Sequence, residues 1–168
     1  GVCPHCGHHF PVELDWYLHN VLGFSGGRRL FPGLEAGNPL GYEGLDLKLR
    51  EAEAATGRKQ AGLAFEAEVQ GVRSVVFALA RAFRGGSVGA AEGEAFVRAA
   101  RRAKRLKLPL VAFVHGTAGI RIQEGVHGLI QMPRCTVAAR EYIEAGGLYL
   151  VLYDTNSYAG PVASFLGC

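Results

Sequence analysis

The chain has 168 residues, of which 49% are hydrophobic and 20% are charged, and its formal net charge at pH 7 is +3. This composition excludes a disordered chain and a coiled coil, and no apolar run approaches the roughly 20 residues of a membrane span. The length suits one domain with a substantial core. The charge is too small to indicate nucleic-acid binding by itself, and we expect a soluble, cytoplasmic protein.

The chain opens with GVCPHCGHHF, in which Cys3 and Cys6 have the spacing of half a zinc site. A structural zinc ion takes four ligands, so a CxxC knuckle needs a second pair from elsewhere. His8 and His9 follow at once and are alternative ligands. The pattern predicts that residues 1–10 form one knuckle of a zinc-binding unit.

Residues 11–62 are rich in glycine and proline, and we expect an irregular linker there with one helix, Leu45 to Thr56, that ends at Gly57. From residue 63 the chain changes to apolar runs. LAFEAEV and SVVFALARAF, joined by QGVR, have the pattern of a β-hairpin.

An amphipathic helix is predicted for AAEGEAFVRAARRAKRLKL, which Pro109 ends. Its apolar face consists of Phe96, Ala99, Ala100, Ala103 and Leu106. The opposite, basic face has two interpretations: it binds coenzyme A phosphates or RNA, or it is simply solvated. Its members are Arg98, Arg101, Arg102, Lys104, Arg105 and Lys107.

Two later segments, LPLVAFVH and LYLVLYD, are short continuous apolar runs, which are typical of buried parallel strands. Each is followed by a glycine-bearing turn and then by helical sequence, namely VHGLIQM and TVAAREYIEAGG after the first and VASFLG after the second. This alternation predicts an α/β fold with right-handed crossovers.

The glycine turns after these strands are the main candidates for chemistry. Backbone N–H groups at the start of a helix bind phosphates or stabilise an oxyanion that develops during a reaction. Alternatively, the glycines only let each strand turn tightly into its helix. His115 ends the first strand, but no Ser, Cys or Asp partner is evident at a readable spacing, which favours a histidine without a catalytic role.

Three segments, FRGGSVG, IRIQEGVHGLIQMPR and LYLVLYDTNSYAGPVASF, resemble successive motifs of the β subunit of acetyl-CoA carboxylase carboxyltransferase. The opening CPHCGHH is similar to the end of that family's zinc ribbon, and EAEAATGRKQA is similar to its helix end before the first hairpin. The order of the five motifs makes the resemblance more specific than any single motif.

The resemblance implies a fold of the α/β class, a partial crotonase-like ββα superhelix preceded by a truncated zinc ribbon. Residues 63–168 are then the N-terminal part of the carboxyltransferase domain. We expect the chain to be an internal segment of a longer protein, in which two upstream cysteines complete the zinc site.

The family transfers a carboxyl group from carboxybiotin to acetyl-CoA, giving malonyl-CoA for fatty-acid biosynthesis. The resemblance therefore implies a structural zinc ion on Cys3 and Cys6, biotin carried on a partner protein, and a coenzyme A thioester as substrate. The implied protein partners are the carboxyltransferase α subunit, in a heterotetramer, and the biotin carboxyl carrier protein. RNA bound through the zinc ribbon is a further alternative.

The reaction forms a thioester enolate and an anionic biotin ureido group, and both need fixed N–H donors more than a side-chain nucleophile. We expect the N–H groups of Gly119 and Gly160, beside Ala118 and Ala159, to bind these two anions, and we expect Gly119 to lie on a surface turn. The residues predicted to bind the acyl-CoA are Gly85, Gly86, Ser87 and Arg121. We also expect Arg121 to pair with Glu124 on one helix face.

Several residues depart from the family's motifs. Ala118 and Ala159 each replace the first glycine of a pair, and Pro161 removes one N–H group. Pro133 stands where the family has a helix-interior alanine, so we expect a kink there. Two explanations stay open for these changes: a divergent or impaired active site, or errors in the sequence. The alternative functions are a carboxyltransferase or decarboxylase subunit for another acyl-CoA, and a zinc-ribbon module that binds nucleic acid.

Overall fold

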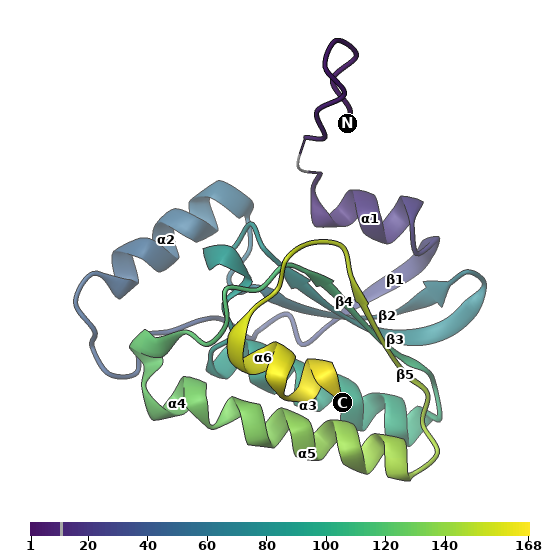
Figure 1. Ribbon diagram of the computed structural model, residues 1–168. Coiled ribbons are helices and arrows are strands. Elements are labelled where there is room, and N and C mark those ends of the chain that lie inside the picture. The colour runs from purple at the N-terminus through teal and green to yellow at the C-terminus, as the bar shows by residue number, and fades with distance from the viewer. Residues whose placement is uncertain (11) are drawn as a thin grey trace.

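The computed structural model describes residues 1–10 and 12–168, which form a mixed five-stranded sheet with helices on both faces (Figure 1). The strands lie in chain order, the first three pairing antiparallel and the last three parallel. The strands are β1 (Phe24–Leu30), β2 (Gly62–Val69), β3 (Val72–Ala80), β4 (Leu110–His115) and β5 (Tyr149–Tyr153). The predicted α/β class is confirmed.

Two apolar clusters lie on opposite faces of the sheet. Helices α3 (Ala90–Leu106) and α5 (Gln131–Glu144) cover the face that holds the larger cluster, around Phe77 and Phe96. Helix α1 (Leu14–Asn20) covers part of the other face with Leu14 and Leu18. The remaining helices are α2 (Leu45–Thr56), α4 (Val126–Leu129) and α6 (Ala159–Ala163). Within the described residues, no helix combines the length and apolar character that crossing a membrane requires.

The predicted hairpin is present, and the two residues of its turn suit the backbone conformation that the turn requires. Val69 pairs with Val72, which leaves Gln70 and Gly71 as a two-residue turn. Both have positive φ, 51° and 76°, as the tight turns that match strand twist require. Gly71 supplies this conformation without steric cost.

The predicted apolar face of α3 is also confirmed, since Phe96, Ala99, Ala100 and Ala103 are buried. In its first turn the carboxylate of Glu92 accepts the Gly89 N–H at 2.9 Å. The helix ends at Leu106, and Lys107 caps it with left-handed φ two residues before Pro109. The α2 prediction is confirmed as well, with Gly57 as a left-handed cap.

The description of residues 11–62 as an irregular linker with one helix is wrong, because this segment also contains α1 and β1. Helix α1 is short and has no side-chain cap, so its local signal is weak. In β1 the register shifts between Ser25 and Arg28, around Gly26 at φ 60°, and this bulge interrupts the alternation that marks a strand. Because β1 pairs with β2, this segment belongs to the sheet.

Two further expectations need correction. Pro133 does not kink a helix, because α5 begins at Gln131 and places the proline in its first turn, where a backbone N–H has no helical acceptor. Strand β5 was predicted to be buried, but it is the last strand of the described sheet, with Leu150 44% and Leu152 41% exposed.

Candidate active site

Three loops meet at the carboxyl edge of the parallel strands, one after each of β3, β4 and β5. The strand ends are in register, since Ala80 pairs with His115 and Val114 pairs with Tyr153. The loops that follow therefore leave the same edge of the sheet side by side. In α/β folds this edge is where ligands bind.

The first and second loops are joined by backbone hydrogen bonds. The Ala118 N–H donates to the Gly85 carbonyl at 2.9 Å, and the Val88 N–H donates to the Gly119 carbonyl at 2.8 Å. Gly86 has φ 69°, and a β-carbon there would lie 2.2 Å from the Gly116 carbonyl oxygen. Gly85 and Gly86 therefore serve close packing of the two loops in this structure.

The second and third loops are joined in the same way. Thr117 pairs with Ser157, and the Tyr158 N–H donates to the Thr117 carbonyl at 3.0 Å. A β-carbon on Gly119 would lie 2.9 Å from that of Ala159. The structure thus brings together Ala118-Gly119 and Ala159-Gly160, which lie far apart in the sequence.

Gly119 is not on a surface turn as we expected. It is buried, has φ 99° and packs against Ala159, so a larger side chain there would disturb the fold. Ala118, in contrast, is exposed beside it. The sequence could not show that the third loop covers Gly119.

The N–H groups of the two motifs differ in their partners. The Gly119 N–H donates to Thr117 Oγ1 at 3.1 Å, and the Ala118 N–H is held by Gly85. Ala159 and Gly160 form the first turn of α6, where N–H groups have no helical acceptor, and Pro161 follows without an N–H. Ala159 and Gly160 thus have N–H groups without a helical acceptor, and their role as donors of the site stays a prediction.

Arg121 lies beneath these loops with only 1% of its side chain exposed. Its guanidinium donates to Glu92 and Glu124, each at 2.7 Å, and to the Ser87 carbonyl at 2.9 Å. Burial alone would lower the pKa of Arg121, but the charges of Glu92 and Glu124 outweigh it and raise that pKa. The expected pair with Glu124 is confirmed. The side chain therefore holds the loops together, and its burial does not fit the predicted contact with acyl-CoA.

The sequence reasoning missed a pair formed by His115 and Asp154. His115 Nδ1 lies 2.5 Å from Asp154 Oδ2, and the two side chains are only 14% and 11% exposed. His115 is the last residue of β4, and Asp154 directly follows β5. Their positions at the ends of two predicted parallel strands could have indicated the pair, because neighbouring parallel strands end at one edge.

The predicted metal ligands lie in the N-terminal hairpin, which projects from the sheet (Figure 1). Backbone hydrogen bonds, first from Cys6 and then from His5, lower the pKa of the Cys3 thiol, which suits a thiolate ligand. Among the described residues, no three His, Cys, Asp or Glu side chains gather closely enough to hold a metal ion. Zinc binding by Cys3 and Cys6 therefore stays a prediction.

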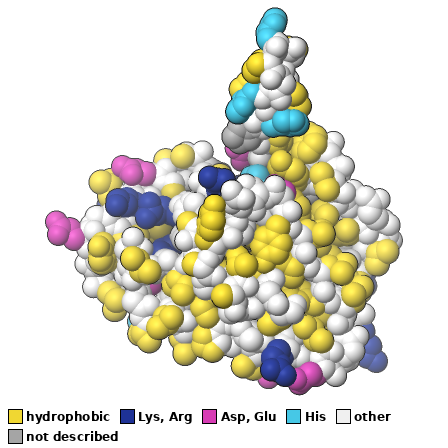
Figure 2. Space-filling view, in the orientation of Figure 1, with side chains coloured by type: hydrophobic (Ala, Val, Ile, Leu, Met, Phe, Trp, Pro, Cys, Tyr) yellow, Lys and Arg dark blue, Asp and Glu magenta, His cyan; other side chains and the backbone are white. Residues whose placement is uncertain are grey.

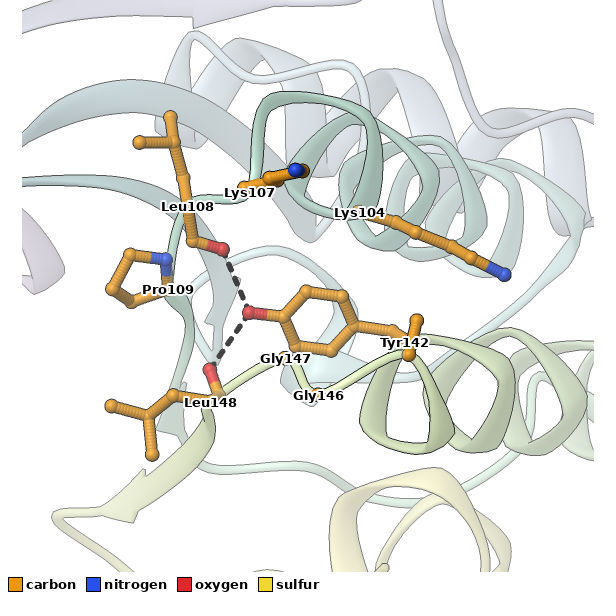
Figure 3. Close-up of a pocket in the computed structure, with 9 residues that line it drawn as sticks. Lys104, Lys107, Leu108, Pro109, Tyr142, Gly146, Gly147 and Leu148 are labelled. Atoms are coloured by element: carbon orange, nitrogen blue, oxygen red, sulfur yellow. Dashed lines mark hydrogen bonds between the residues drawn. The ribbon is translucent and has the colours of Figure 1, made fainter.

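A separate pocket of about 560 Å³ lies at the opposite edge of the sheet, before β4 and β5 (Figure 3). Tyr142 donates to the carbonyls of Leu108 and Leu148, at 2.7 and 2.9 Å, which closes one wall. Lys104 and Lys107 stand at its rim. The three loops that follow β3, β4 and β5 contribute no residue to the lining of this pocket.

Comparison with solved structures defines the class of fold. The protein aligns over 77% of its length with 23% of the transcarboxylase 12S chain, solved with hydrolysed methylmalonyl-coenzyme A bound, at TM-score 0.61 and 19% identity. It aligns over 80% of its length with 48% of a chain of a Pseudomonas malonate decarboxylase heterotetramer, at TM-score 0.56 and 21% identity. The protein therefore shares its fold with parts of these two enzymes, which is consistent with the partial crotonase-like fold that the motifs predicted.

Comparison with curated sequences is more specific. The chain is 33% identical over 168 residues to the acetyl-coenzyme A carboxylase carboxyl transferase subunit beta of Chloroflexus aggregans, covering 98% of this chain and 54% of that protein. The subunits of the same name from Rubrobacter xylanophilus and Gluconobacter oxydans are 32% and 36% identical, again over 98% of this chain and over 63% and 57% of theirs.

The resemblance found in the motifs is thus confirmed, and the chain is related to the carboxyltransferase β subunits. It spans little more than half the length of these relatives. No protein-family model matches it.

Proposed function

We propose that the chain is part of an acetyl-CoA carboxylase carboxyltransferase β subunit, which transfers a carboxyl group from carboxybiotin to acetyl-CoA and forms malonyl-CoA. The similarity to the named β subunits over 98% of the chain carries this proposal. The convergence of three glycine-bearing loops at one sheet edge supports it, because fixed backbone donors suit a reaction that passes through anions.

The donors of the site have distinct roles in this proposal. The Ala159 and Gly160 N–H groups, which have no helical acceptor in the first turn of α6, bind one developing anion. The Gly119 N–H binds the other after its 3.1 Å bond to Thr117 Oγ1, which closes a small local ring, gives way. Which anion is the enolate and which is the ureido oxygen stays open.

The residues predicted to bind acyl-CoA act mainly by supporting these donors. Gly86 and Ser87 contact the second loop and Arg121, and Arg121 is buried. The thioester is expected to approach the exposed backbone at Ala118 and Ala159.

Two cofactors belong to the proposal. Biotin, carried on a partner protein, brings the carboxyl group. A zinc ion held by Cys3 and Cys6 stabilises the N-terminal knuckle once two more ligands join it. Residues 1–10 then form part of a zinc ribbon, and the sheet with its helices forms the N-terminal part of the carboxyltransferase domain.

The partners are the α subunit and the biotin carboxyl carrier protein. Hydrophobic side chains gather over β5 and beside α1 on the face that Figure 2 shows. They include Trp16, Leu148, Leu150, Leu152 and Tyr153, each more than 40% exposed. An apolar face of this kind is typical of a subunit interface.

The nucleic-acid alternative receives less support from the structure. On the basic face of α3, Arg102 is paired with Glu66 and Arg98 with Glu94, so these charges are partly neutralised. A carboxyltransferase for another acyl-CoA remains an alternative, since the fold is shared with transcarboxylase 12S and malonate decarboxylase.

Enzyme assays with the full-length protein that contains this chain test the proposal. We expect malonyl-CoA to form from acetyl-CoA and carboxybiotin only when the α subunit is present. Faster carboxylation of propionyl-CoA would indicate a carboxyltransferase for another acyl-CoA. A salt-sensitive gel shift with RNA would favour the nucleic-acid-binding module. Full-rate transfer by the β protein alone would contradict the two-subunit proposal.

A further inference from the structure

The residues of the two donor motifs differ in what surrounds them. A β-carbon on Gly160 would lie 2.8 Å from Ile120 and 3.1 Å from Met132, so the protein itself fills the space beside this residue. The space beside Gly119 is filled as well, because a β-carbon there would lie 2.9 Å from that of Ala159. Ala159, in contrast, is an exposed residue. A bound substrate can therefore reach Ala159.

The backbone of Ala159 is strained. It has φ 61°, a left-handed conformation that glycine adopts freely and that alanine adopts only at a cost in free energy. The carboxyltransferase motif that this loop resembles has glycine at the equivalent position, so the turn itself does not require the methyl group. Backbone strain of this kind is concentrated at active sites and ligand-binding segments, which favours a functional role for the methyl group.

The methyl group of Ala159 lies next to the predicted donors. It is bonded to the same α-carbon as the Ala159 nitrogen, and the Gly160 nitrogen is the next one along the chain. Both N–H groups belong to the first turn of α6, where they have no helical acceptor. A thioester oxygen that accepts one of them at about 2.9 Å brings its acyl carbons close to the methyl group.

We propose that Ala159 determines the acyl specificity of the site, because its methyl group fills the space that the terminal methyl of a propionyl thioester needs. This inference rests on the proposed function, and it places the thioester, rather than the ureido group, beside Ala159. Propionyl and acetyl groups differ by one methylene, and alanine and glycine differ by the same unit. Removing the methyl group of Ala159 therefore makes room for the larger substrate.

Competition assays with the full-length protein in complex with the α subunit test the proposal. They measure the ratio of kcat/KM for propionyl-CoA to kcat/KM for acetyl-CoA. The parent complex should favour acetyl-CoA. We expect Ala159→Gly to raise the ratio about 10-fold or more, since one methylene in a tight pocket changes discrimination by roughly 10- to 200-fold.

Gln70→Gly is the matched control for the relief of strain. Gln70 also has left-handed φ, 51°, but it lies in the turn between β2 and β3, at the opposite end of β3 from the donor loops. Its replacement with glycine relieves the same kind of backbone strain, so the ratio should keep its parent value. An equal rise in the ratio for Gln70→Gly and Ala159→Gly would overturn the proposal, because the methyl group would not be its cause.

Two other results would overturn the proposal. The first is a ratio in Ala159→Gly that equals the parent ratio, with a thermal melt showing that the variant is folded. The second needs no variant: a parent complex that carboxylates propionyl-CoA as readily as acetyl-CoA has no acyl specificity for Ala159 to determine. A parent complex that carboxylates neither thioester would instead count against the proposed function itself.

Discussion

Ala159 and Ala118 occupy matching positions in the two loop motifs, yet their backbones differ. Ala159 has φ 61°, a left-handed conformation that an L-residue other than glycine adopts at a cost of roughly 1–2 kcal/mol. Ala118 is absent from the positive-φ residues of the structure. The resemblance indicated that glycine is the family's residue at both positions, but the structure shows a need for it only at Ala159.

We therefore expect glycine substitutions at the two positions to have opposite effects on stability. Ala159→Gly should raise the free energy of unfolding by about 0.5–1 kcal/mol, because relief of strain exceeds the added freedom of the unfolded chain. Ala118→Gly, the matched control, should lower it by about 0.5 kcal/mol. Urea unfolding measures both, and a loss of stability in Ala159→Gly would show that Ala159 is not strained.

At the scale of single residues, the sequence could indicate which glycine turns are candidates for the site, but not which hydrogen bonds their backbone groups form. The glycine turns were recognised, and the structure brings them together. The bond that occupies the Ala118 N–H group, and the burial of Arg121, depend on contacts between loops that lie about 30 residues apart in the chain. No local pattern encodes such contacts.

At the scale of secondary-structure elements, Glu66 ties four elements together. It lies on β2 and accepts hydrogen bonds from Arg28 on β1, Arg73 on β3 and Arg102 on α3. The bonds from Arg73 and then Arg102 are the main reason that the pKa of Glu66 falls from 4.5 to about 2. The carboxylate is 10% exposed, while two of its arginines are more than 60% exposed.

This pairing predicts a pH dependence of stability. Because the pKa of Glu66 is lower in the folded state, its contribution is complete above about pH 4.5 and is lost as the pH falls toward 2. Glu66→Gln should cost about 2 kcal/mol at pH 6, after allowance for solvent at the exposed arginines, and about half of that or less at pH 3.

Urea unfolding of the parent and the variant at the two pH values measures the effect. Glu68→Gln is the matched control, since Glu68 is exposed on the same strand and should show little change at either pH. An equal loss at pH 6 and pH 3 for Glu66→Gln would show that the charge of Glu66 contributes nothing.

The strong elements could be predicted from the sequence because their signals are local. The apolar face of α3, the hairpin and the run of β4 each have a period or a boundary residue that identifies them. Strand β1 could not be predicted, since Gly26 and Gly27 lie in its bulge, and α1 is held mainly by the packing of Leu14 and Leu18 against the sheet.

At the scale of the whole molecule, the N-terminal hairpin of residues 1–10 projects away from the sheet (Figure 1). Its backbone is closed by the bridge of Val2 with His9 and by the Cys3 N–H bond to the His8 carbonyl, 2.8 Å long. We expect metal analysis of the 168-residue chain to find much less than one zinc ion per molecule, because Cys3 and Cys6 supply only two thiolates. A longer protein that supplies two further cysteine ligands should bind one equivalent of zinc. A full equivalent bound tightly by the chain alone would instead make His8 or His9 a ligand.

The apolar face over β5 gives the last prediction. Leu150 and Leu152 are 44% and 41% exposed, so replacing both with serine should leave the fold largely intact. If this face binds the α subunit, the double variant should weaken the complex at least about 10-fold, because each buried leucine contributes roughly 1.5–3 kcal/mol. Carboxyl transfer should then fall at low protein concentration and recover when the α subunit is added in excess.

Leu47→Ser is the control for that experiment, because Leu47 is 57% exposed on α2, away from β5. Light scattering of the mixed subunits, together with a thermal melt of each variant, separates loss of binding from loss of folding. A folded Leu150→Ser, Leu152→Ser variant that binds the α subunit as tightly as Leu47→Ser would contradict the prediction. The interface with the α subunit would then lie on another face of the protein.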